Sequence, residues 1–130
     1  MISTIATADA PQAIGPYSQA RRAGGFVFAS GQIALDPASG ELVGKDITAQ
    51  AEQVMRNVMA IVKAAGGSAE NIVRTTCYLH DIGDFAAFNE VYARYLGGEH
   101  APARSCVGGL QLPRGALCEV EVTLWLGTDG

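Results

Sequence analysis

Arg104 lies in a run of small and apolar residues, Ala101-Pro102-Ala103-Arg104-Ser105-Cys106-Val107, which has the composition of a strand. Burying a guanidinium without a counter-ion is costly, so this side chain needs an anion. Its planar fork matches a carboxylate through two parallel hydrogen bonds, which makes a small organic acid a candidate ligand. The alternative is an ion pair with Glu119 or Glu121, which requires no ligand.

Glu119 is the candidate residue that would act on a ligand together with Arg104. The period of two along a strand places Arg104 and Cys106 on one face, and the alternation of the last strand predicts Glu119 on that same side. A carboxylate within reach of a water molecule can hold it or remove its proton. Glu121 is the alternative, as a structural partner of Arg104.

Four further residues are weaker candidates. Cys106 could be a nucleophile, but no histidine neighbours it and nothing predicts a lowered thiol pKa, so packing or a backbone contact is favoured. Ser30, beside Gly31 at a strand end, offers a hydroxyl group or is only a turn residue. Tyr17 is either an aromatic wall or lid of a pocket or a packed edge residue.

The sequence predicts neither a disulfide framework nor a metal site. The three cysteines, Cys77, Cys106 and Cys118, form no C-x-x-C pair. His80 and His100 are far apart and lack the i, i+4 spacing of metal ligands on a helix. No cofactor is expected.

Composition indicates one globular domain over residues 1–130, with 48% hydrophobic and 17% charged residues and a formal net charge of −4. Only 9 Lys and Arg against 13 Asp and Glu argue against nucleic-acid binding. No apolar run approaches the ~20 residues of a membrane span, and no secretion signal is visible at the N-terminus. We therefore expect a cytoplasmic protein that binds no membrane.

Two helices and about six strands must position these residues. A helical stripe predicts a helix from Asp46 to Gly66-Gly67, with Asp46 or Thr48 as its cap. A second helix is predicted from Asp84 to about Leu96. The inward-facing residues of the second helix would be Phe85, Phe88, Val91, Tyr92 and Tyr95.

Turn residues and alternation predict the strands. Gly24-Gly25 indicates a hairpin. Further strands are expected at 73–80, with Val73 on its apolar face, at 103–109 and at 117–126. The pattern predicts a two-layer α+β domain with both helices on one face of the sheet. The other face carries Glu119, Glu121 and Trp125, and a subunit interface would cover it.

Four motifs in order resemble the reactive-intermediate deaminase family, also called the RidA or YjgF-like family, whose members also carry the description endoribonuclease L-PSP. The resemblance runs nearly from end to end of the chain. It rests on Ile14-Gly15-Pro16-Tyr17-Ser18-Gln19-Ala20, Phe28-Ala29-Ser30-Gly31-Gln32-Ile33, Phe85-Ala86-Ala87-Phe88-Asn89-Glu90-Val91-Tyr92 and Pro102-Ala103-Arg104-Ser105-Cys106-Val107, with the Glu119-Val120-Glu121 strand.

The resemblance implies a chorismate-mutase-like fold, a homotrimer and ligand clefts between subunits. It further implies hydrolysis of 2-imino acids, such as 2-iminopropanoate and 2-iminobutanoate, to 2-keto acids and ammonia without a cofactor. Arg104 would clamp the substrate carboxylate and Glu119 would position water. Backbone groups at Cys106 and Gly31 would line the cleft, and Tyr17, Ser30 and Asn89 would complete it.

Two other functions stay open. The same arginine cleft could bind small carboxylates without turnover, and a ribonuclease or translation-inhibitor activity is attributed to some relatives. Gly108-Gly109 departs from the family pattern, which typically has side chains at both positions. We expect this pair to remove part of a pocket or interface wall and to weaken or bulge the strand.

Overall fold

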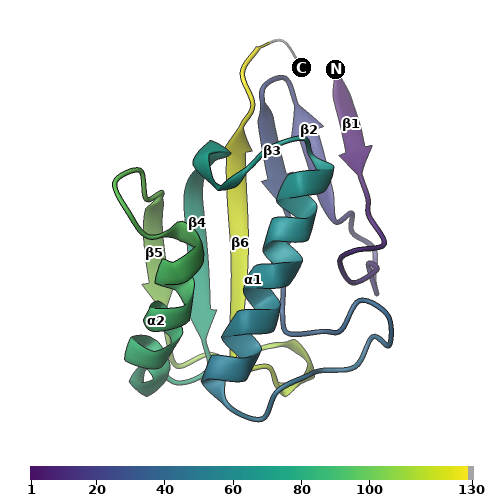
Figure 1. Cartoon of the computed structure of the whole chain (residues 1–130). Helices are drawn as coiled ribbons and strands as arrows, with labels where there is room; N and C mark the ends of the chain where they lie inside the picture. The colour runs from purple at the N-terminus through teal and green to yellow at the C-terminus, as the bar shows by residue number, and fades with distance from the viewer. Residues whose placement is uncertain (129–130) are drawn as a thin grey trace.

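The computed structural model describes residues 1–128 as six strands and two α-helices, joined in part by short 3-10 turns. The sheet order is β1-β2-β3-β6-β4-β5, in which β4 and β5 are parallel and the other neighbours antiparallel. Both helices cover one face of this sheet, and β1 and β5 are its edges (Figure 1). The predicted two-layer α+β arrangement with a mixed six-stranded sheet is confirmed. The elements are β1 Ile2–Ile5, β2 Ala20–Ala23, β3 Phe26–Ala29, α1 Ile47–Ala64, β4 Ile72–Leu79, α2 Phe85–Leu96, β5 Ala103–Val107 and β6 Cys118–Trp125.

Helix α1 begins and ends where the sequence predicts. The Asp46 carboxylate accepts a hydrogen bond from the Ala49 backbone N–H at 2.8 Å, which satisfies a free donor of the first turn. Gly66, at φ +89°, follows the last turn in a conformation that favours glycine. The apolar stripe of α1 is buried against the sheet through Ile47, Ala51, Val54, Met55, Val58, Ile61 and Val62.

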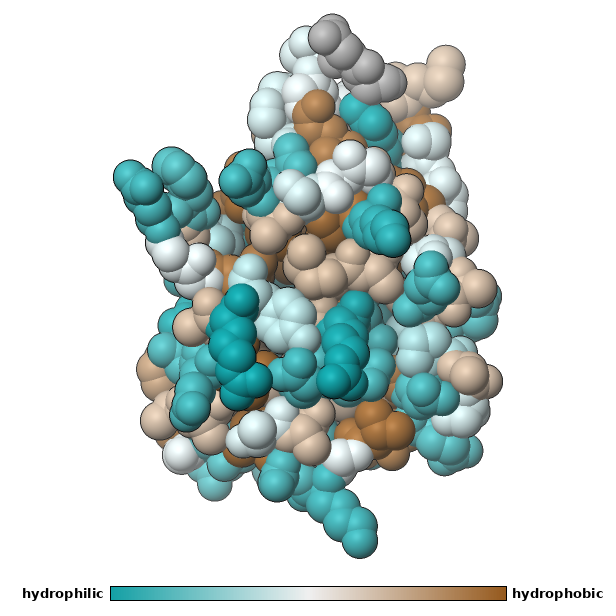
Figure 2. All heavy atoms as spheres, viewed as in Figure 1, coloured by the Kyte–Doolittle hydropathy of each residue, from teal (hydrophilic) through white to brown (hydrophobic). Residues whose placement is uncertain are grey.

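Helix α2 buries most of its predicted stripe, through Phe88, Val91, Tyr92 and also Leu96. Phe85 is predicted to face inward but is 37% exposed, because it is the first residue of the helix. Tyr95 is only partly buried. The outer surface of both helices is mostly hydrophilic, with small scattered apolar patches (Figure 2). That surface therefore needs no further cover.

Strand β6 fixes the two faces of the sheet. Cys118, Val120, Val122 and Leu124 are buried beneath the helices, as the alternation predicts. On the opposite, open face lie the partly buried Glu119, Glu121 and Thr123 and the exposed Trp125. Phe26 and Phe28 also lie there, and the Phe26 and Trp125 rings are 4.8 Å apart. The open face thus combines carboxylates with exposed aromatic rings.

The predicted inward position of Val73 is wrong. Val73 is 43% exposed, because the pairing of β4 with β6 shifts register between Ile72 and Arg74. One additional residue at this bulge puts Ile72 and Thr75 on the buried side. Periodicity alone cannot locate such an insertion.

The predicted strand 103–109 ends earlier, at Val107. A Cβ at Gly108 would lie 2.6 Å from the Ile82 Cβ, so the Ile82 side chain fills the space that a side chain would take. Gly109 has φ +78° and turns the chain away from the sheet. The glycine pair therefore ends the strand, and no bulge forms within it.

We predict that Asp46→Ala lowers the free energy of unfolding by about 1 kcal/mol, because the Ala49 N–H loses its acceptor. Urea denaturation followed by circular dichroism measures this change. Asp46→Asn is the matched control, since asparagine caps helices about as well as aspartate. Equal losses in both variants would contradict a capping role.

Candidate functional site

Arg104 lies on the helix-covered side of the edge strand β5. It pairs with Thr75 of β4, which in turn pairs with Val122 of β6, and residues in register share a face. Thr75 and Val122 are both buried beneath the helices. The arginine side chain therefore extends toward helix α2.

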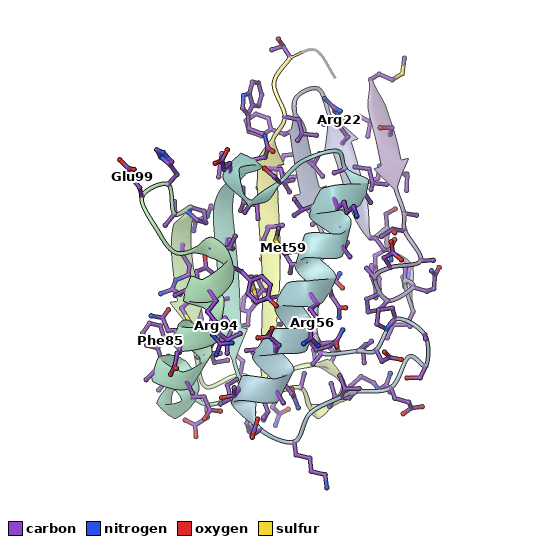
Figure 3. All side chains as sticks on the ribbon, viewed as in Figure 1. Arg22, Arg56, Met59, Phe85, Arg94 and Glu99 are labelled. Carbon is purple, nitrogen blue, oxygen red and sulfur yellow. The ribbon has the colours of Figure 1, made fainter. Side chains whose placement is uncertain are left out.

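The guanidinium is held by three side chains of α2. Its carbon lies 4.7 Å from the centre of the Tyr92 ring and 5.4 Å from that of Phe85, within the range of cation–π attraction. Asn89 accepts a hydrogen bond from Nη1 at 2.5 Å through Oδ1. Figure 3 shows Phe85 at the start of α2, on the β5 side of the molecule. We call Arg104, Asn89, Phe85 and Tyr92 the arginine cradle.

The cradle leaves the guanidinium without a counter-ion. Among residues 1–128, the only salt bridges join Glu52 to Arg56 and Arg94, and Arg104 takes part in none. The predicted alternative, an ion pair of Arg104 with Glu119 or Glu121, is therefore wrong within the chain. Asn89 is neutral, so the remaining N–H groups of the guanidinium are donors for an anion.

Cys106 lies beside Arg104 on the same face, as predicted, and pairs with Cys77. Burial raises the pKa of the Cys106 thiol, although the Arg104 charge lowers it in part. Burial raises the pKa of both Cys77 and Cys118 to about 12. Since the thiolate is the nucleophile, none of the three is activated for attack.

Glu119 lies on the opposite face from Arg104, and the expectation that they share a side is wrong. Glu119 pairs with Tyr78 of β4, which pairs with Val107 of β5, one position beyond the partly buried Cys106. The alternation within each strand is as predicted. Which residues of two strands share a face, however, is set by the register of their pairing. The sheet thus separates Glu119 from Arg104 within one chain.

A hollow of about 410 Å³ on the open face contains most of the other predicted residues. Tyr17, Ser30, Gly31 and Glu119 all line it, as does Glu121. The apolar part of its wall consists of Pro11, Ile14, Ile33, Leu35 and Pro113. We call this the face hollow.

The segment after β3 brings Gly31 against Glu119. Gln32 exchanges two backbone hydrogen bonds with Val120, at 2.9 and 3.1 Å, so this segment runs beside β6. A Cβ at Gly31 would lie 2.1 Å from Glu119 Oε2. Only glycine lets the carboxylate lie directly on the backbone here. The buried Asn57 fixes the next turn by donating to the carbonyls of Ile33 and Leu35.

Burial raises the pKa of Glu119, and the negative charge of Glu121 raises it further. Tyr78 donates a hydrogen bond of 2.5 Å to Glu121 Oε1. This bond raises the pKa of Tyr78 to about 12, because the phenol must keep its proton to donate. Glu119 is therefore a carboxyl group that can exchange a proton closer to neutral pH than an ordinary glutamate.

The N-terminal loop supplies the remaining wall. Ser30 donates its hydroxyl hydrogen to the Ser18 carbonyl at 2.6 Å, so that hydroxyl holds the loop in place. Tyr17 is 47% exposed, and its hydroxyl accepts from the Ile14 N–H at 3.3 Å. The buried Gln19 donates to the carbonyls of Thr7, Ala10 and Pro11. Gln19 was not among the predicted site residues, because its partners are backbone atoms of no particular residue type.

Within residues 1–128, no group of three or more His, Cys, Asp or Glu side chains is arranged to hold a metal ion. Neither described α-helix has the length and apolar character needed to cross a bilayer.

The candidate residues thus form two groups. Arg104 and Cys106 of β5 lie at the sheet edge with Asn89 of α2 beside them, and Tyr17, Ser30, Gly31 and Glu119 lie in the face hollow. The first group is suited to bind a small anion. The second offers a carboxylate that can move a proton, set in a partly apolar hollow.

The family model described as endoribonuclease L-PSP matches residues 7–125. The chain belongs to this family, which is also known as the YjgF/RidA family. The 2-iminobutanoate/2-iminopropanoate deaminase of Salmonella typhimurium is 46% identical over 123 residues, covering 93% of this chain and 95% of that protein. A RutC family protein of Pyrococcus horikoshii is 50% identical over 121 residues, covering 93% and 95% respectively.

The crystal structure of E. coli TdcF with bound serine has the same fold, with a TM-score of 0.89 and 41% identity. The match covers 96% of this chain and 99% of that one. At these identities the resemblance found in the sequence motifs is confirmed at the level of the family.

We predict that the thiols of the folded protein react more slowly with an aromatic disulfide reagent at pH 7.5 than free cysteine does. The reason is that burial disfavours each thiolate. Absorbance of the released thiol measures the rate, and the unfolded chain should release three equivalents. Cys106→Ser identifies the contribution of the most accessible thiol. A Cys106 reaction faster than that of free cysteine would contradict the raised pKa.

Proposed function

We propose that this chain hydrolyses 2-imino acids such as 2-iminopropanoate and 2-iminobutanoate to 2-keto acids and ammonia. The observation that carries the proposal is the Arg104 guanidinium, which is oriented by three side chains and forms no salt bridge among residues 1–128. A small carboxylate matches its planar donors. Relatives named as deaminases for these two imines, at 46% and 44% identity, support the same reaction class.

The proposed active site forms between copies of the chain. The arginine cradle at the β5 edge and the face hollow lie on opposite sides of the sheet, so one copy cannot bring them together. In a closed ring of three, the β5 edge of each copy would meet the face hollow of the next. This arrangement also covers Phe26, Phe28 and Trp125, which are otherwise exposed apolar surface.

The chemistry needs only positioning and one proton carrier. Arg104 binds the substrate carboxylate and fixes the adjacent C2 atom. The substrate reacts as the protonated imine. Glu119 takes a proton from water as the water oxygen bonds to C2 and the C=N π electrons move to nitrogen, which gives a neutral carbinolamine. The same proton passes to the amine nitrogen, the C–N bond breaks, and ammonia leaves. The hydroxyl proton is then lost, to Glu119 or to the departing ammonia, and the keto acid remains.

Tests of imine hydrolysis can also support one of two other functions. A serine-bound structure of E. coli TdcF is compatible with a carboxylate-binding role without turnover. Binding of 2-ketobutyrate without imine hydrolysis would support that role. The endoribonuclease description of the family suggests RNA cleavage, but 9 basic against 13 acidic residues provide little attraction for phosphates.

We predict that Arg104→Ala lowers kcat/KM for imine hydrolysis about 10²-fold, through loss of the carboxylate clamp. Glu119→Gln should lower it about 10²-fold or more through loss of the proton carrier. The assay generates 2-iminobutanoate with an auxiliary dehydratase and times the appearance of the keto acid. Arg94→Ala and Glu90→Gln are matched controls on the exposed surface of α2 and should leave the rate unchanged. A wild-type chain without any acceleration would contradict the proposal.

We predict that co-expressed Arg104→Ala and Glu119→Gln chains regain activity that neither variant has alone. Each site takes Arg104 from one copy and Glu119 from another, so random mixing makes about a quarter of the sites intact. Mixed oligomers are separated by two affinity tags before the assay. No recovery in verified mixed oligomers would contradict a site built between copies.

A further inference from the structure

Tyr78, Glu121 and Glu119 form a continuous polar row on the open face of the sheet. Tyr78 on β4 is in register with Glu119 on β6, and its hydroxyl reaches along the strand to Glu121. Glu119 and Glu121 are two residues apart on one strand, so both side chains leave the sheet on the same side. Both carboxylates line the face hollow.

This row gives Glu121 a fixed acceptor role that the proposed chemistry does not use. The hydrogen bond from Tyr78 holds the Glu121 carboxylate in place beside Glu119. Two neighbouring carboxylates resist ionising together.

We propose that Tyr78 and Glu121 are positioning residues that set the protonation range of Glu119. The expected effect on turnover rests on the proposed function. The interaction among the three side chains does not depend on that function. The fixed charge of Glu121 lets Glu119 keep its proton to higher pH than an isolated glutamate. Glu119 can then both remove a proton from water and return one to the amine near neutral pH.

The charges around the row are few among the described residues. Facing Glu119 are Glu121 on β6, Tyr78 on β4 and Tyr17 in the N-terminal loop. Arg74 on β4 is beside Glu121 in an adjoining hollow of about 220 Å³, where it donates to Ser105 at 2.9 Å. In the proposed oligomer, Arg104 of a neighbouring copy would add a positive charge, which acts alike on wild type and variants.

Two substitutions should lower the pKa of Glu119 by different amounts. Glu121→Gln removes the neighbouring negative charge, so the pKa of Glu119 should fall. Tyr78→Phe removes the donor that holds the Glu121 carboxylate beside Glu119, so the repulsion between the two carboxylates weakens and the pKa of Glu119 should fall by less. A change of general stability would not produce this order of shifts.

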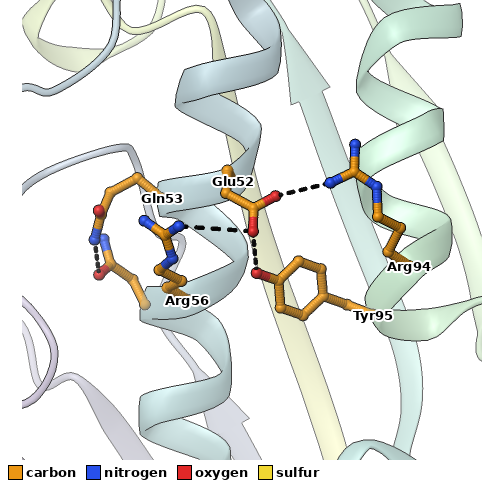
Figure 4. A network of polar contacts seen from close by, with 6 residues as sticks. Glu52, Gln53, Arg56, Arg94 and Tyr95 are labelled. Carbon is orange, nitrogen blue, oxygen red and sulfur yellow. Dashed lines mark hydrogen bonds and ion pairs between the residues drawn. The ribbon is translucent and has the colours of Figure 1, made fainter.

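Tyr95→Phe is the matched control. Tyr95 also donates to a carboxylate, that of Glu52, at 2.6 Å, but it does so between α1 and α2 on the other side of the molecule (Figure 4). The substitution removes the same hydroxyl from the same kind of bond. It should leave the titration of Glu119 unchanged.

The direct test is a pH titration of the protein with 13C-labelled glutamate side chains, followed by NMR, with the Glu119 signal assigned from Glu119→Gln. This readout requires no turnover, so it remains decisive if the imine deaminase activity is absent. We expect a lower midpoint for Glu119 in Glu121→Gln, a smaller decrease in Tyr78→Phe and no change in Tyr95→Phe. An unchanged Glu119 midpoint in both Glu121→Gln and Tyr78→Phe would overturn the proposal.

The second readout is the pH profile of kcat/KM with 2-iminobutanoate. The base form of Glu119 is lost as pH falls through its pKa, so the acidic limb follows that pKa. At pH 5, Glu121→Gln should keep a share of its pH 7.5 rate that is about threefold larger than in the wild type, and Tyr78→Phe should keep a share between these two. Parallel losses at every pH, without a shift of the limb, would contradict a role in protonation.

Discussion

The pairing of β4 with its two neighbours is the constraint on which the rest of the structure depends. Through β4, Arg104 shares the helix-covered face with Thr75 and Val122, whereas Glu119 shares the open face with Tyr78. No rearrangement of side chains can move a residue through a hydrogen-bonded sheet. A site that uses both an anion clamp and a proton-carrying carboxylate therefore requires more than one copy of the chain.

Each half of the proposed site is built from a different kind of support. The arginine cradle relies on aromatic faces and one amide, which orient the guanidinium without neutralising it. The face hollow relies on backbone pairing of Gln32 with Val120 and on the absence of a side chain at Gly31. Neutral supports leave the charge of Arg104 available to a ligand, and partial burial disfavours the charge of Glu119.

The sequence predicted the elements well because their signals are local. The cap at Asp46, the hairpin at Gly24-Gly25 and the alternation of β6 each depend on neighbouring residues, and all three are present. The family motifs also named residues at both halves of the site. The relation between the halves was missed, because alternation gives the faces of one strand and not their phase against the next. The bulge at Val73 was not predicted for a similar reason, since only the pairing of β4 with β6 reveals it.

A crystal structure with bound 2-ketobutyrate tests the central claim most directly. The account predicts the ligand carboxylate on the Arg104 guanidinium of one copy, with its keto carbon near Glu119 of a neighbouring copy. A ligand bound within one copy, or an Arg104 side chain that faces solvent while the ligand lies elsewhere, would contradict it.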